Sequence, residues 1–186
     1  MGPSETPSGI ISPSLKRSLI SSLSLAQKKI KLSKERIVDI VLLHPEIPHN
    51  TGAIGRLCVG LGWPLHIIRP MGFAIDEKHI RRAGLDYWQH LQLTLHDSFE
   101  AYLEARKPST LTFLSTKAPR TLYESEFQPD GALIFGCESA GLPKGYYERY
   151  EAQLAVLPMP GEHARSINLA NAVAIAAYEA YRRFNT

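Results

Sequence analysis

The chain has 186 residues, of which 44% are hydrophobic and 21% charged, and its formal net charge is +3. Such a chain fits one compact α/β domain with a substantial core and leaves no room for a second full domain. No apolar run approaches the roughly 18 residues of a membrane span, and the N-terminus lacks the apolar segment of a secretory signal. We therefore expect a soluble, cytoplasmic protein without a membrane partner.

Charge is unevenly distributed along the sequence. Residues 1–36 include seven basic and two acidic residues, whereas the remainder includes 14 basic and 16 acidic residues. The start is also rich in Ser, Pro and Lys, a composition that buries too little surface to offset its ordering entropy. We expect a flexible basic extension over residues 1–36 and one folded domain over residues 37–186. The Ser-rich start weakly resembles an organelle transit peptide.

Several classes of site are disfavoured by the sequence. Cys58 and Cys137 stand far apart without a C-x-x-C partner, so we expect free, buried thiols and neither a disulfide framework nor a zinc site. The seven histidines are scattered, and no metal site is predicted. Neither a Walker loop nor a G-x-G-x-x-G fingerprint follows an expected strand, which argues against an NTPase or a dinucleotide-binding enzyme.

From Ile37 onward, short apolar runs alternate with helix-like segments. The expected strands are Ile37–Leu43, Leu65–Ile68, Leu111–Ser115, Ala132–Phe135 and Leu154–Leu157. The expected helices are Gly52–Gly60, Asp76–Ala83, Ser98–Arg106, Gly145–Tyr150 and Ser166–Phe184. Strands that are apolar on both faces and separated by helices predict an α/β fold with a mostly parallel sheet and helices on both faces. Ligands of such sheets bind at the carboxyl ends of the strands, so the loops there form the candidate site.

The first of these loops runs from Pro45 to Cys58. We expect Asn50 to cap a helix that begins near Gly52, with Arg56 one turn into that helix. A helix N-terminus beside a guanidinium can hold a phosphate or a developing oxyanion. The alternative interpretation is an ordinary capped helix with a surface arginine.

The second loop runs from Phe135 to Pro143. Gly136 ends an apolar strand and would let a ligand approach the backbone closely, while Gly141 permits a sharp turn. Glu138 follows directly. A carboxylate at such a turn more often accepts backbone N–H bonds than acts as a general base, and we favour that structural role.

The third loop runs from Leu157 to Asn171. A rigid Pro/Gly segment leads to Ser166, which we expect to cap a long helix, with Asn168 and Asn171 on its first turns. Asparagines at a helix start usually serve as caps or face solvent. Two of them behind a serine also suit a binding site.

Together the loops resemble the three signature motifs of the SpoU-like RNA 2′-O-methyltransferases of the SPOUT class. The matching patterns are N-x-x-x-x-x-R from Asn50, G-x-E-x-x-G-L-P from Gly136 and S-x-N-L-x-N-A from Ser166. The segments Ile67–Phe73 and Arg81–Trp88 are similar to those of the subfamily that modifies the wobble cytidine or uridine of tRNA. The resemblance covers about 150 residues, everything except the N-terminal extension.

The resemblance implies a particular architecture. It implies a trefoil knot in the C-terminal half of the domain, where the second and third loops would form a pocket for S-adenosylmethionine. It also implies an obligate homodimer in which each site is completed near the partner. The Ala-rich stretch Asn171–Ala177 suits a contact between subunits, although packing on the chain's own sheet would explain it equally well.

The resemblance further implies roles for individual residues. Those assigned to S-adenosylmethionine, directly or as support for the loops, are Leu114, Gly136, Glu138, Leu157, Met159 and Ser166. Those assigned to catalysis are Asn50, Arg56, Ser166 and Asn168. The family places Arg56 beside the ribose 2′-hydroxyl. Because deprotonating a guanidinium is costly, we expect Arg56 to stabilise the developing alkoxide instead.

The expected RNA contacts are cations beside aromatic rings that could stack on an exposed base. They are Arg81, Arg82, Tyr87 and Trp88, with Arg165 and the basic N-terminal extension as further candidates, and the partner that the resemblance implies is the anticodon stem-loop of tRNA. Solvated surface charge around a core tryptophan is the alternative interpretation of this segment.

The reaction that the resemblance implies is S-adenosylmethionine-dependent 2′-O-methylation of the ribose of nucleotide 34, a cytidine or modified uridine, in tRNA. Two alternatives stay open from the sequence. The enzyme could modify another tRNA position or rRNA, or the chain could be a non-catalytic RNA-binding protein with the same fold.

Overall fold

The computed structural model describes residues 36–74 and 86–185. Its strands are β1 (Asp39–Leu43), β2 (Leu65–Ile68), β3 (Leu93–His96), β4 (Leu111–Leu114), β5 (Ala132–Phe135) and β6 (Leu154–Ala155). Its α-helices are α2 (Pro48–Leu61), α4 (Phe99–Arg106), α5 (Tyr146–Arg149) and α6 (Leu169–Asn185). The 3-10 helices are η2 (Asp86–His90), η3 (Leu122–Glu124) and η4 (Glu151–Gln153). The expected helix Asp76–Ala83 lies outside the described residues.

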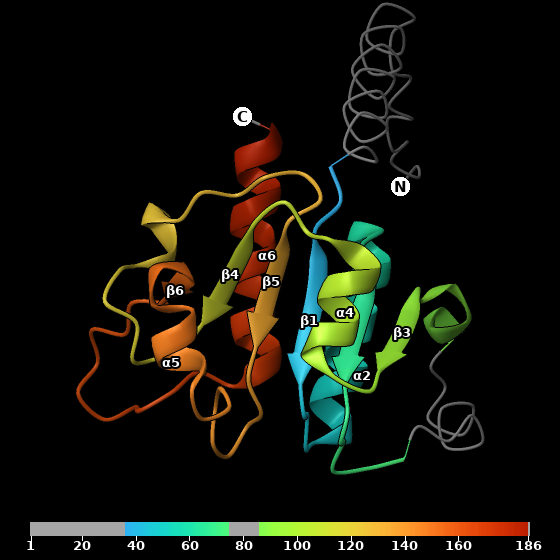
Figure 1. The fold of residues 1–186 in the computed structure, drawn as a ribbon, viewed down its shortest axis with the longest axis horizontal. Helices are drawn as coiled ribbons and strands as arrows, with labels where there is room; N and C mark the ends of the chain where they lie inside the picture. The colour runs from blue at the N-terminus through green and yellow to red at the C-terminus, as the bar shows by residue number, and fades with distance from the viewer. Residues whose placement is uncertain (1–35, 75–85, 186) are drawn as a thin grey trace, which may run out of the picture. The chain divides into compact units, whose positions relative to one another are not determined.

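The strands form one six-stranded sheet in the order β3-β2-β1-β5-β4-β6. Every neighbouring pair is parallel, and in the centre Ile40 of β1 pairs with Leu65 of β2 and Leu133 of β5. All arrows in Figure 1 point the same way, so the segments that follow β4, β5 and β1 gather at one edge of the sheet. The predicted α/β class with a parallel sheet is confirmed. The trefoil knot stays a prediction.

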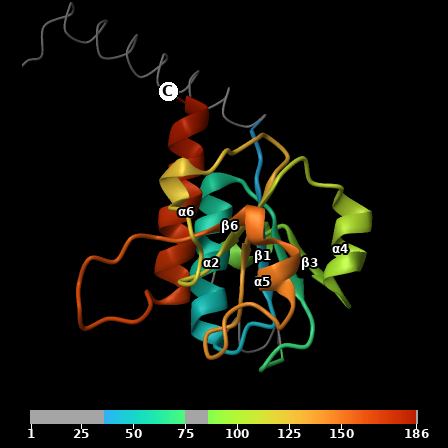
Figure 2. The ribbon, with the colours of Figure 1, turned by 60° about the vertical axis from the view of Figure 1, so that its left-hand side comes forward.

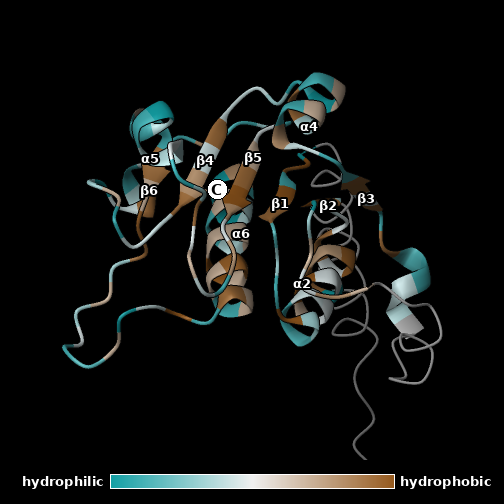
Figure 3. Ribbon diagram, turned by 60° about the horizontal axis from the view of Figure 1, so that its bottom comes forward, coloured by the Kyte–Doolittle hydropathy of each residue, from teal (hydrophilic) through white to brown (hydrophobic). Residues whose placement is uncertain are grey.

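Each face of the sheet has its own apolar cluster, because alternate strand residues point to opposite sides. On one face Ile40 and Leu42 pack with Ile54 of α2 and with α6. On the other face Val41 packs with Phe99 of α4 and with the aromatic side chains around α5. Figure 2 shows α2 and α6 side by side on one side of the sheet and α4 on the other. Figure 3 shows the strands as the most hydrophobic segments, in agreement with their burial.

The edge strand β3 is the element that the sequence analysis missed. Among the described strands it pairs only with β2, and its residues Leu93, Thr94 and Leu95 alternate between half-buried and exposed before the buried His96. Four such residues at an edge give little periodic signal. By contrast, β2 and β5 have the predicted bounds, whereas β1, β4 and β6 are shorter than the expected Ile37–Leu43, Leu111–Ser115 and Leu154–Leu157. No helix within the described ranges is long and apolar enough to cross a membrane.

The Ala-rich stretch of α6 packs within its own chain. Ala176, Ala177 and Ala180 are fully buried in the cluster shared with α2 and the sheet. Packing on the chain's own sheet, one of the two explanations open from the sequence, therefore accounts for these small residues. Ile175 and Tyr178 lie elsewhere on the helix, where they are 40% and 55% exposed.

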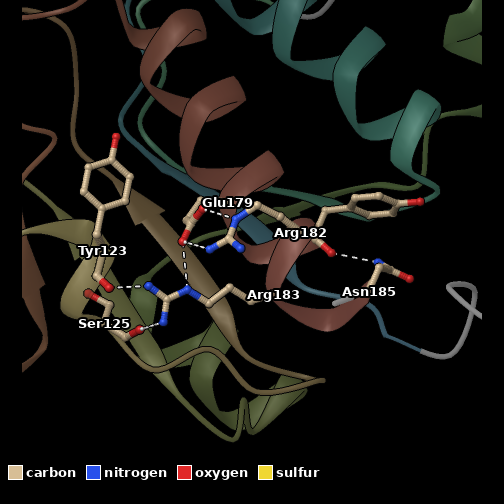
Figure 4. Close-up of polar contacts among 7 residues, drawn as sticks. Tyr123, Ser125, Glu179, Arg182, Arg183 and Asn185 are labelled. Atoms are coloured by element: carbon tan, nitrogen blue, oxygen red, sulfur yellow. Dashed lines mark hydrogen bonds and ion pairs between the residues drawn. The ribbon is translucent and has the colours of Figure 1, made fainter.

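The last turns of α6 hold the η3 turn in place, as Figure 4 shows. The Arg183 guanidinium donates to the carbonyl oxygen of Tyr123 and, at 2.8 Å, to the Glu179 carboxylate. The η3 turn is in turn paired with the chain after β6, because the Leu122 N–H donates to the Val156 carbonyl at 2.8 Å. The C-terminal helix thus fixes a segment that borders the candidate site.

A buried polar network joins β1, β2, β3 and α4. The Asp39 carboxylate is buried and accepts two bonds of 2.9 Å from Arg106 and one of 3.0 Å from the Tyr102 hydroxyl. His66 Nε2 lies 3.4 Å from Asp39, and His66 Nδ1 lies 3.0 Å from His96 Nε2. Burial acts to raise the pKa of Asp39, but the contacts with His66 and Arg106 outweigh it and lower this pKa to about 2. We call these five residues the Asp39 network.

Candidate active site

A cleft of about 490 Å³ lies at the carboxyl ends of β4, β5 and β6. Its walls come from the segments after these strands and from the first residues of α2 and α6. The volume is typical of small-molecule sites. The predicted site residues that line the cleft are Asn50, Leu114, Gly136, Glu138, Leu157, Met159, Ser166 and Asn168.

The first loop differs from the prediction in where its helix begins. The helix α2 starts at Pro48, with Ile47 in the capping position and without a side-chain cap. Proline is favoured at this first helical position, because its missing N–H would have no partner there anyway. The expectation that Asn50 caps the helix is therefore wrong. Asn50 lies inside the first turn, and its side chain is buried and directed into the site.

The amide of Asn50 joins the three motif loops. Its Nδ2 donates to Glu138 Oε1 at 2.9 Å, and its Oδ1 accepts from Asn168 Nδ2 at 3.0 Å. These partners are 88 and 118 residues away along the chain. An amide side chain suits this position because it offers a donor and an acceptor in one group. We call Asn50, Glu138 and Asn168 the loop-joining triad.

The first and second loops are also linked by two carboxylates. Glu138 accepts from the N–H groups of Glu46 at 2.8 Å and Ile47 at 3.2 Å. Glu46 in turn accepts from the N–H of Ser139 at 2.9 Å and from its hydroxyl at 2.7 Å. The bonds from the Ser139 hydroxyl and N–H lower the pKa of Glu46 below its usual value. Glu138 thus has the structural role that the sequence favoured over that of a general base.

Gly136 is required by the fold of its own loop. A β-carbon at this position would lie 2.1 Å from the backbone carbon of Gly141 and 2.4 Å from the nitrogen of Leu142. Cys137 and Gly141 exchange two backbone bonds of 3.0 Å, and Gly141 adopts a φ of 73° to make the turn. The sharp turn at Gly141 was predicted. The position that a β-carbon of residue 136 would occupy is filled by the chain itself, while the Gly136 backbone lines the cleft, so the expected approach of a ligand to it stays a prediction.

The third loop is capped by a different residue from the one expected. Asn168 Oδ1 accepts from the N–H groups of Ala170 and Asn171 at 2.9 and 3.3 Å, and its carbonyl accepts from the Ala172 N–H at 2.9 Å. Asn168 is therefore the cap of α6, and the expectation that Ser166 plays this role is wrong. Ser166 is exposed and lines the cleft instead.

The cleft combines apolar walls with a few polar groups. Leu114, Leu157 and Met159 provide apolar surface suited to an adenine ring, while Ser115 and Ser166 add hydroxyls. In size and in chemistry these residues fit the S-adenosylmethionine that the resemblance implies. No group of three or more His, Cys, Asp or Glu residues suited to a metal ion occurs in the described part of the chain.

Arg56 does not line the cleft of its own chain. Its side chain is exposed, and the guanidinium lies 4.7 Å from the centre of the Tyr87 ring. The Tyr87 hydroxyl donates to the Gly52 carbonyl at 2.8 Å, and Trp88 packs beside Gly55. Both aromatic rings therefore rest against α2 and are half-buried.

The remaining candidate RNA contacts are placed as follows. Arg165 is exposed in the third loop and does not line the cleft. Arg81 and Arg82 lie outside the described residues.

Of the two cysteines, both free, Cys58 is buried as expected and Cys137 is half-buried. Burial raises the pKa of Cys58 to about 12, which keeps it a thiol.

Four residues of the site escaped the sequence analysis. Glu46 and Ser139 form the second link between the loops, and Lys117 and Tyr147 line the cleft. Glu46 gave no signal of its own, since its partner is 93 residues away. Lys117 did carry one, because it follows the expected strand Leu111–Ser115 at the edge where ligands bind.

A parallel sheet with three distant loops interlocked at its carboxyl edge, beside a cleft that fits an adenosine, is the architecture of an α/β transferase of the SpoU-like type. The chain belongs to the SpoU rRNA Methylase family, whose model matches residues 38–178. The family resemblance read from the three motifs is thereby confirmed.

Curated relatives share most of their length with this chain. The tRNA (cytidine(34)-2'-O)-methyltransferase of Escherichia coli strain K12 is 45% identical over 148 residues, which cover 79% of this chain and 94% of the relative. The protein of the same name from Aeromonas hydrophila subsp. hydrophila is 45% identical over 150 residues, with the same two coverages of 79% and 94%.

Solved structures give the same fold. One described as "Structural insights into the 2-OH methylation of C/U34 on tRNA" has a TM-score of 0.71 and 47% identity, and the match covers 81% of this chain and 97% of that one. The SpoU methyltransferase AviRb from Streptomyces viridochromogenes, in complex with the cofactor AdoMet, has a TM-score of 0.67 and 24% identity. That match covers 81% of this chain and 58% of the AviRb chain. The latter supports the fold alone.

Proposed function

We propose that this protein is a tRNA 2′-O-methyltransferase that modifies the ribose of nucleotide 34 with S-adenosylmethionine as methyl donor. The observation that carries the proposal is the 45% identity to enzymes of that name over 94% of their length. The joined motif loops support it, because Asn50, Glu138 and Asn168 bond to one another beside the cleft.

The cleft would hold the methyl donor. When bound, S-adenosylmethionine supplies a methyl group on a positively charged sulfur. Leu114, Leu157 and Met159 would contact the adenine, and the second and third loops would contribute backbone groups and the Ser166 hydroxyl. The loop-joining triad keeps these walls in position, and such positioning supplies a large part of the rate of many enzymes.

Arg56 would act on the ribose. A guanidinium presents a delocalised positive charge and several N–H donors in a planar fork, so Arg56 suits the stabilisation of a developing 2′-alkoxide and of an adjacent phosphate. To test this role, methylation by Arg56→Ala and Arg56→Lys is compared with wild type under single-turnover conditions. We expect a large loss with alanine and a partial loss with lysine, which keeps the charge but not the planar fork. Near-normal turnover in both variants would remove Arg56 from the chemistry.

We also propose that the active form is a homodimer. Arg56 lies outside the cleft of its own chain, so a partner is needed if a cleft and an Arg56 are to meet. Ile175 and Tyr178 offer exposed apolar surface on α6 for such a contact. The trefoil knot implied by the motifs is part of the same proposal.

The dimer proposal has a direct test by subunit mixing. Arg56→Ala is co-expressed with Leu114→Arg, a variant that places a long charged chain in the cleft. If Arg56 serves the partner's cleft, mixed dimers contain one intact site, and activity recovers to about a quarter of wild type for statistical mixing. If Arg56 serves its own cleft, mixing restores nothing.

For tRNA recognition we propose the exposed Arg165 beside the cleft, together with Arg81, Arg82 and the η2 aromatics. Tyr87 and Trp88 already pack against α2, so they would contribute their free edges and faces rather than whole rings. The anticodon stem-loop would bind there, in the cytoplasm, where tRNA is modified. We keep residues 1–36 as a basic extension outside the catalytic domain.

The decisive experiment is methylation of bulk tRNA with S-adenosylmethionine, followed by nucleoside analysis and mapping of the modified position. We expect 2′-O-methylcytidine or a 2′-O-methylated modified uridine at position 34. A methyl group at another tRNA position or in rRNA would change the substrate while keeping the reaction. Binding of tRNA without any transfer would make the chain a non-catalytic RNA-binding protein.

A further inference from the structure

We propose that Lys117 forms a subsite for the carboxylate at the amino-acid end of the methyl donor. The inference rests on the proposed function, since it concerns the same cleft, and it adds a residue that none of the three motifs contains. It has three supports: the charge of the cleft, the way Lys117 is held, and the charges of the ligand.

The first support is the charge of the cleft. Among its described lining residues, Lys117 is the single Lys or Arg and Glu138 the single Asp or Glu. Both Glu138 oxygens already accept hydrogen bonds from the first loop. The Lys117 ammonium forms no ion pair with any carboxylate of the described residues. The cleft therefore offers one positive charge with no anionic partner.

The second support is the position of Lys117 between two walls of the cleft. The turn after β4 is fixed by the Ser115 N–H, which donates to the Ala155 carbonyl at 2.9 Å, and by the Lys117 N–H, which donates to Ser115 Oγ at 3.1 Å. The Lys117 ammonium lies 5.1 Å from the centre of the Tyr147 ring of α5. A cation held over an aromatic face has fewer orientations to lose when an anion binds.

The third support is the charge pattern of S-adenosylmethionine. Its adenine suits the apolar walls at Leu114, Leu157 and Met159. Its sulfonium and ammonium groups are positive and are repelled by a lysine, so its carboxylate is the one group that Lys117 attracts. An RNA phosphate is the other anion to consider. The donor's carboxylate is favoured because Lys117 lines the cleft itself and is held there against Tyr147.

The test compares two ligands that differ only in the carboxylate. S-adenosylhomocysteine and its decarboxylated analogue, which keeps the propylamine chain, are titrated calorimetrically into wild type, Lys117→Met and Lys117→Arg. We expect Lys117→Met to weaken S-adenosylhomocysteine roughly tenfold, as for loss of one charge-assisted hydrogen bond, and to leave the analogue nearly unchanged. Lys117→Arg should keep most of the affinity for S-adenosylhomocysteine.

Controls separate a local effect from a general one. Lys144→Met removes an exposed cation beside the second loop that does not line the cleft, and it should alter neither affinity. Tyr147→Leu removes the ring that holds the ammonium and should weaken S-adenosylhomocysteine less than Lys117→Met does. The thermal midpoint of each variant checks that folding is intact.

The possible outcomes are distinct. Equal weakening of both ligands by Lys117→Met would overturn the subsite, because the effect would not depend on the carboxylate. Weaker tRNA binding with unchanged S-adenosylhomocysteine affinity would overturn it in favour of a phosphate contact. A wild-type protein that binds neither adenosyl ligand would overturn the proposed function itself.

Discussion

Two polar networks are attached to opposite ends of β1, and they differ in whether their residues border a cleft in which a ligand could bind. The Asp39 network, at the start of the strand, joins charged and polar groups of four elements to one another, and none of its residues lines the cleft. The loop-joining triad, after the end of the strand, also bonds internally but forms the wall of a cleft. Burial and hydrogen bonding alone therefore do not mark a functional site. What marks the functional site is the cleft that borders the loop-joining triad and is absent from the Asp39 network.

Among substitutions in the two regions, we expect the largest effect from Gly136→Ala in the second loop. The added carbon would meet backbone atoms of the second loop at 2.1 to 2.4 Å, so the loop must move. We expect a loss of about 3 kcal/mol of stability or more, with loss of measurable S-adenosylhomocysteine binding. Gly161→Ala in the third loop is the matched control, since its added carbon meets nothing within 4 Å. Comparable damage from both variants would contradict the steric explanation.

The next effect comes from Asp39→Asn, which damages only the structural network. Removing the charge leaves Arg106 and Tyr102 without their anionic acceptor, and we expect a loss of about 3 kcal/mol in the free energy of unfolding. The affinity for S-adenosylhomocysteine should stay at the wild-type value at temperatures where the variant is folded. Chemical denaturation and calorimetry measure the two quantities. A clear loss of affinity would show that the two networks are coupled.

The complementary change is Glu138→Gln in the triad. Glutamine has nearly the same shape but presents one amide NH₂ to donors that now bond to a carboxylate, namely the Glu46 and Ile47 N–H groups and Asn50 Nδ2. We expect a roughly tenfold weaker S-adenosylhomocysteine affinity and a smaller stability loss than in Asp39→Asn. Glu148→Gln on exposed α5 is the control. A Glu138→Gln variant that loses stability but keeps its affinity for S-adenosylhomocysteine would contradict a role of the triad in holding the walls of the cleft.

A pH titration gives the next smaller effect. The pKa of Asp39 is lowered to about 2 from an ordinary value of 3.8, so the unfolded state binds the proton more tightly than the folded state. The resulting stabilisation, about 2 kcal/mol, is present above pH 4 and is lost as the pH falls toward 2. The free energies of unfolding of wild type and Asp39→Asn, measured across this pH range, should converge at low pH. Parallel curves would mean that Asp39 is not the responsible group.

The smallest effect concerns His96. Burial, and then the neighbouring His66, lower the pKa of His96 below its ordinary value of 6.5. The unfolded state therefore takes up a proton first on acidification, and stability declines as the pH drops below about 6.5. His96→Gln should remove this part of the pH dependence, as measured by denaturation between pH 7 and pH 5. If the free energy of unfolding of His96→Gln falls with pH as steeply as that of wild type, another group is responsible for this pH dependence.

The sequence predicted what local pattern determines and missed what long-range contact determines. The buried strands Leu65–Ile68 and Ala132–Phe135 were found with their bounds, whereas the edge strand Leu93–His96 was not found. The start of α2 was misplaced although Pro48 marked it, because Asn50 is also a good cap. Its side chain serves contacts 88 and 118 residues away, which no local rule reveals.

The candidate site shows the same division. The three motifs identified most residues of the cleft, but the link between Glu46 and Ser139 spans 93 residues and carries no pattern. The glycine at 136 was recognised as special, but the sequence did not reveal that a β-carbon there would meet the backbone of its own loop. Arg56 matched the family motif, yet in the structure of the single chain its guanidinium lies over the Tyr87 ring and does not line the cleft.

The bond between Asn168 and Asn50 has a consequence for synthesis on the ribosome. Its two partners are 118 residues apart, and the later one follows all six strands of the sheet in the sequence. A nascent chain can pair β1 with β2 and β5 long before this bond forms, because those strands emerge earlier. The bond that joins the first and third loops therefore forms only after every strand has been made, and a polypeptide that stops short of residue 168 would contain all six strands but lack this bond.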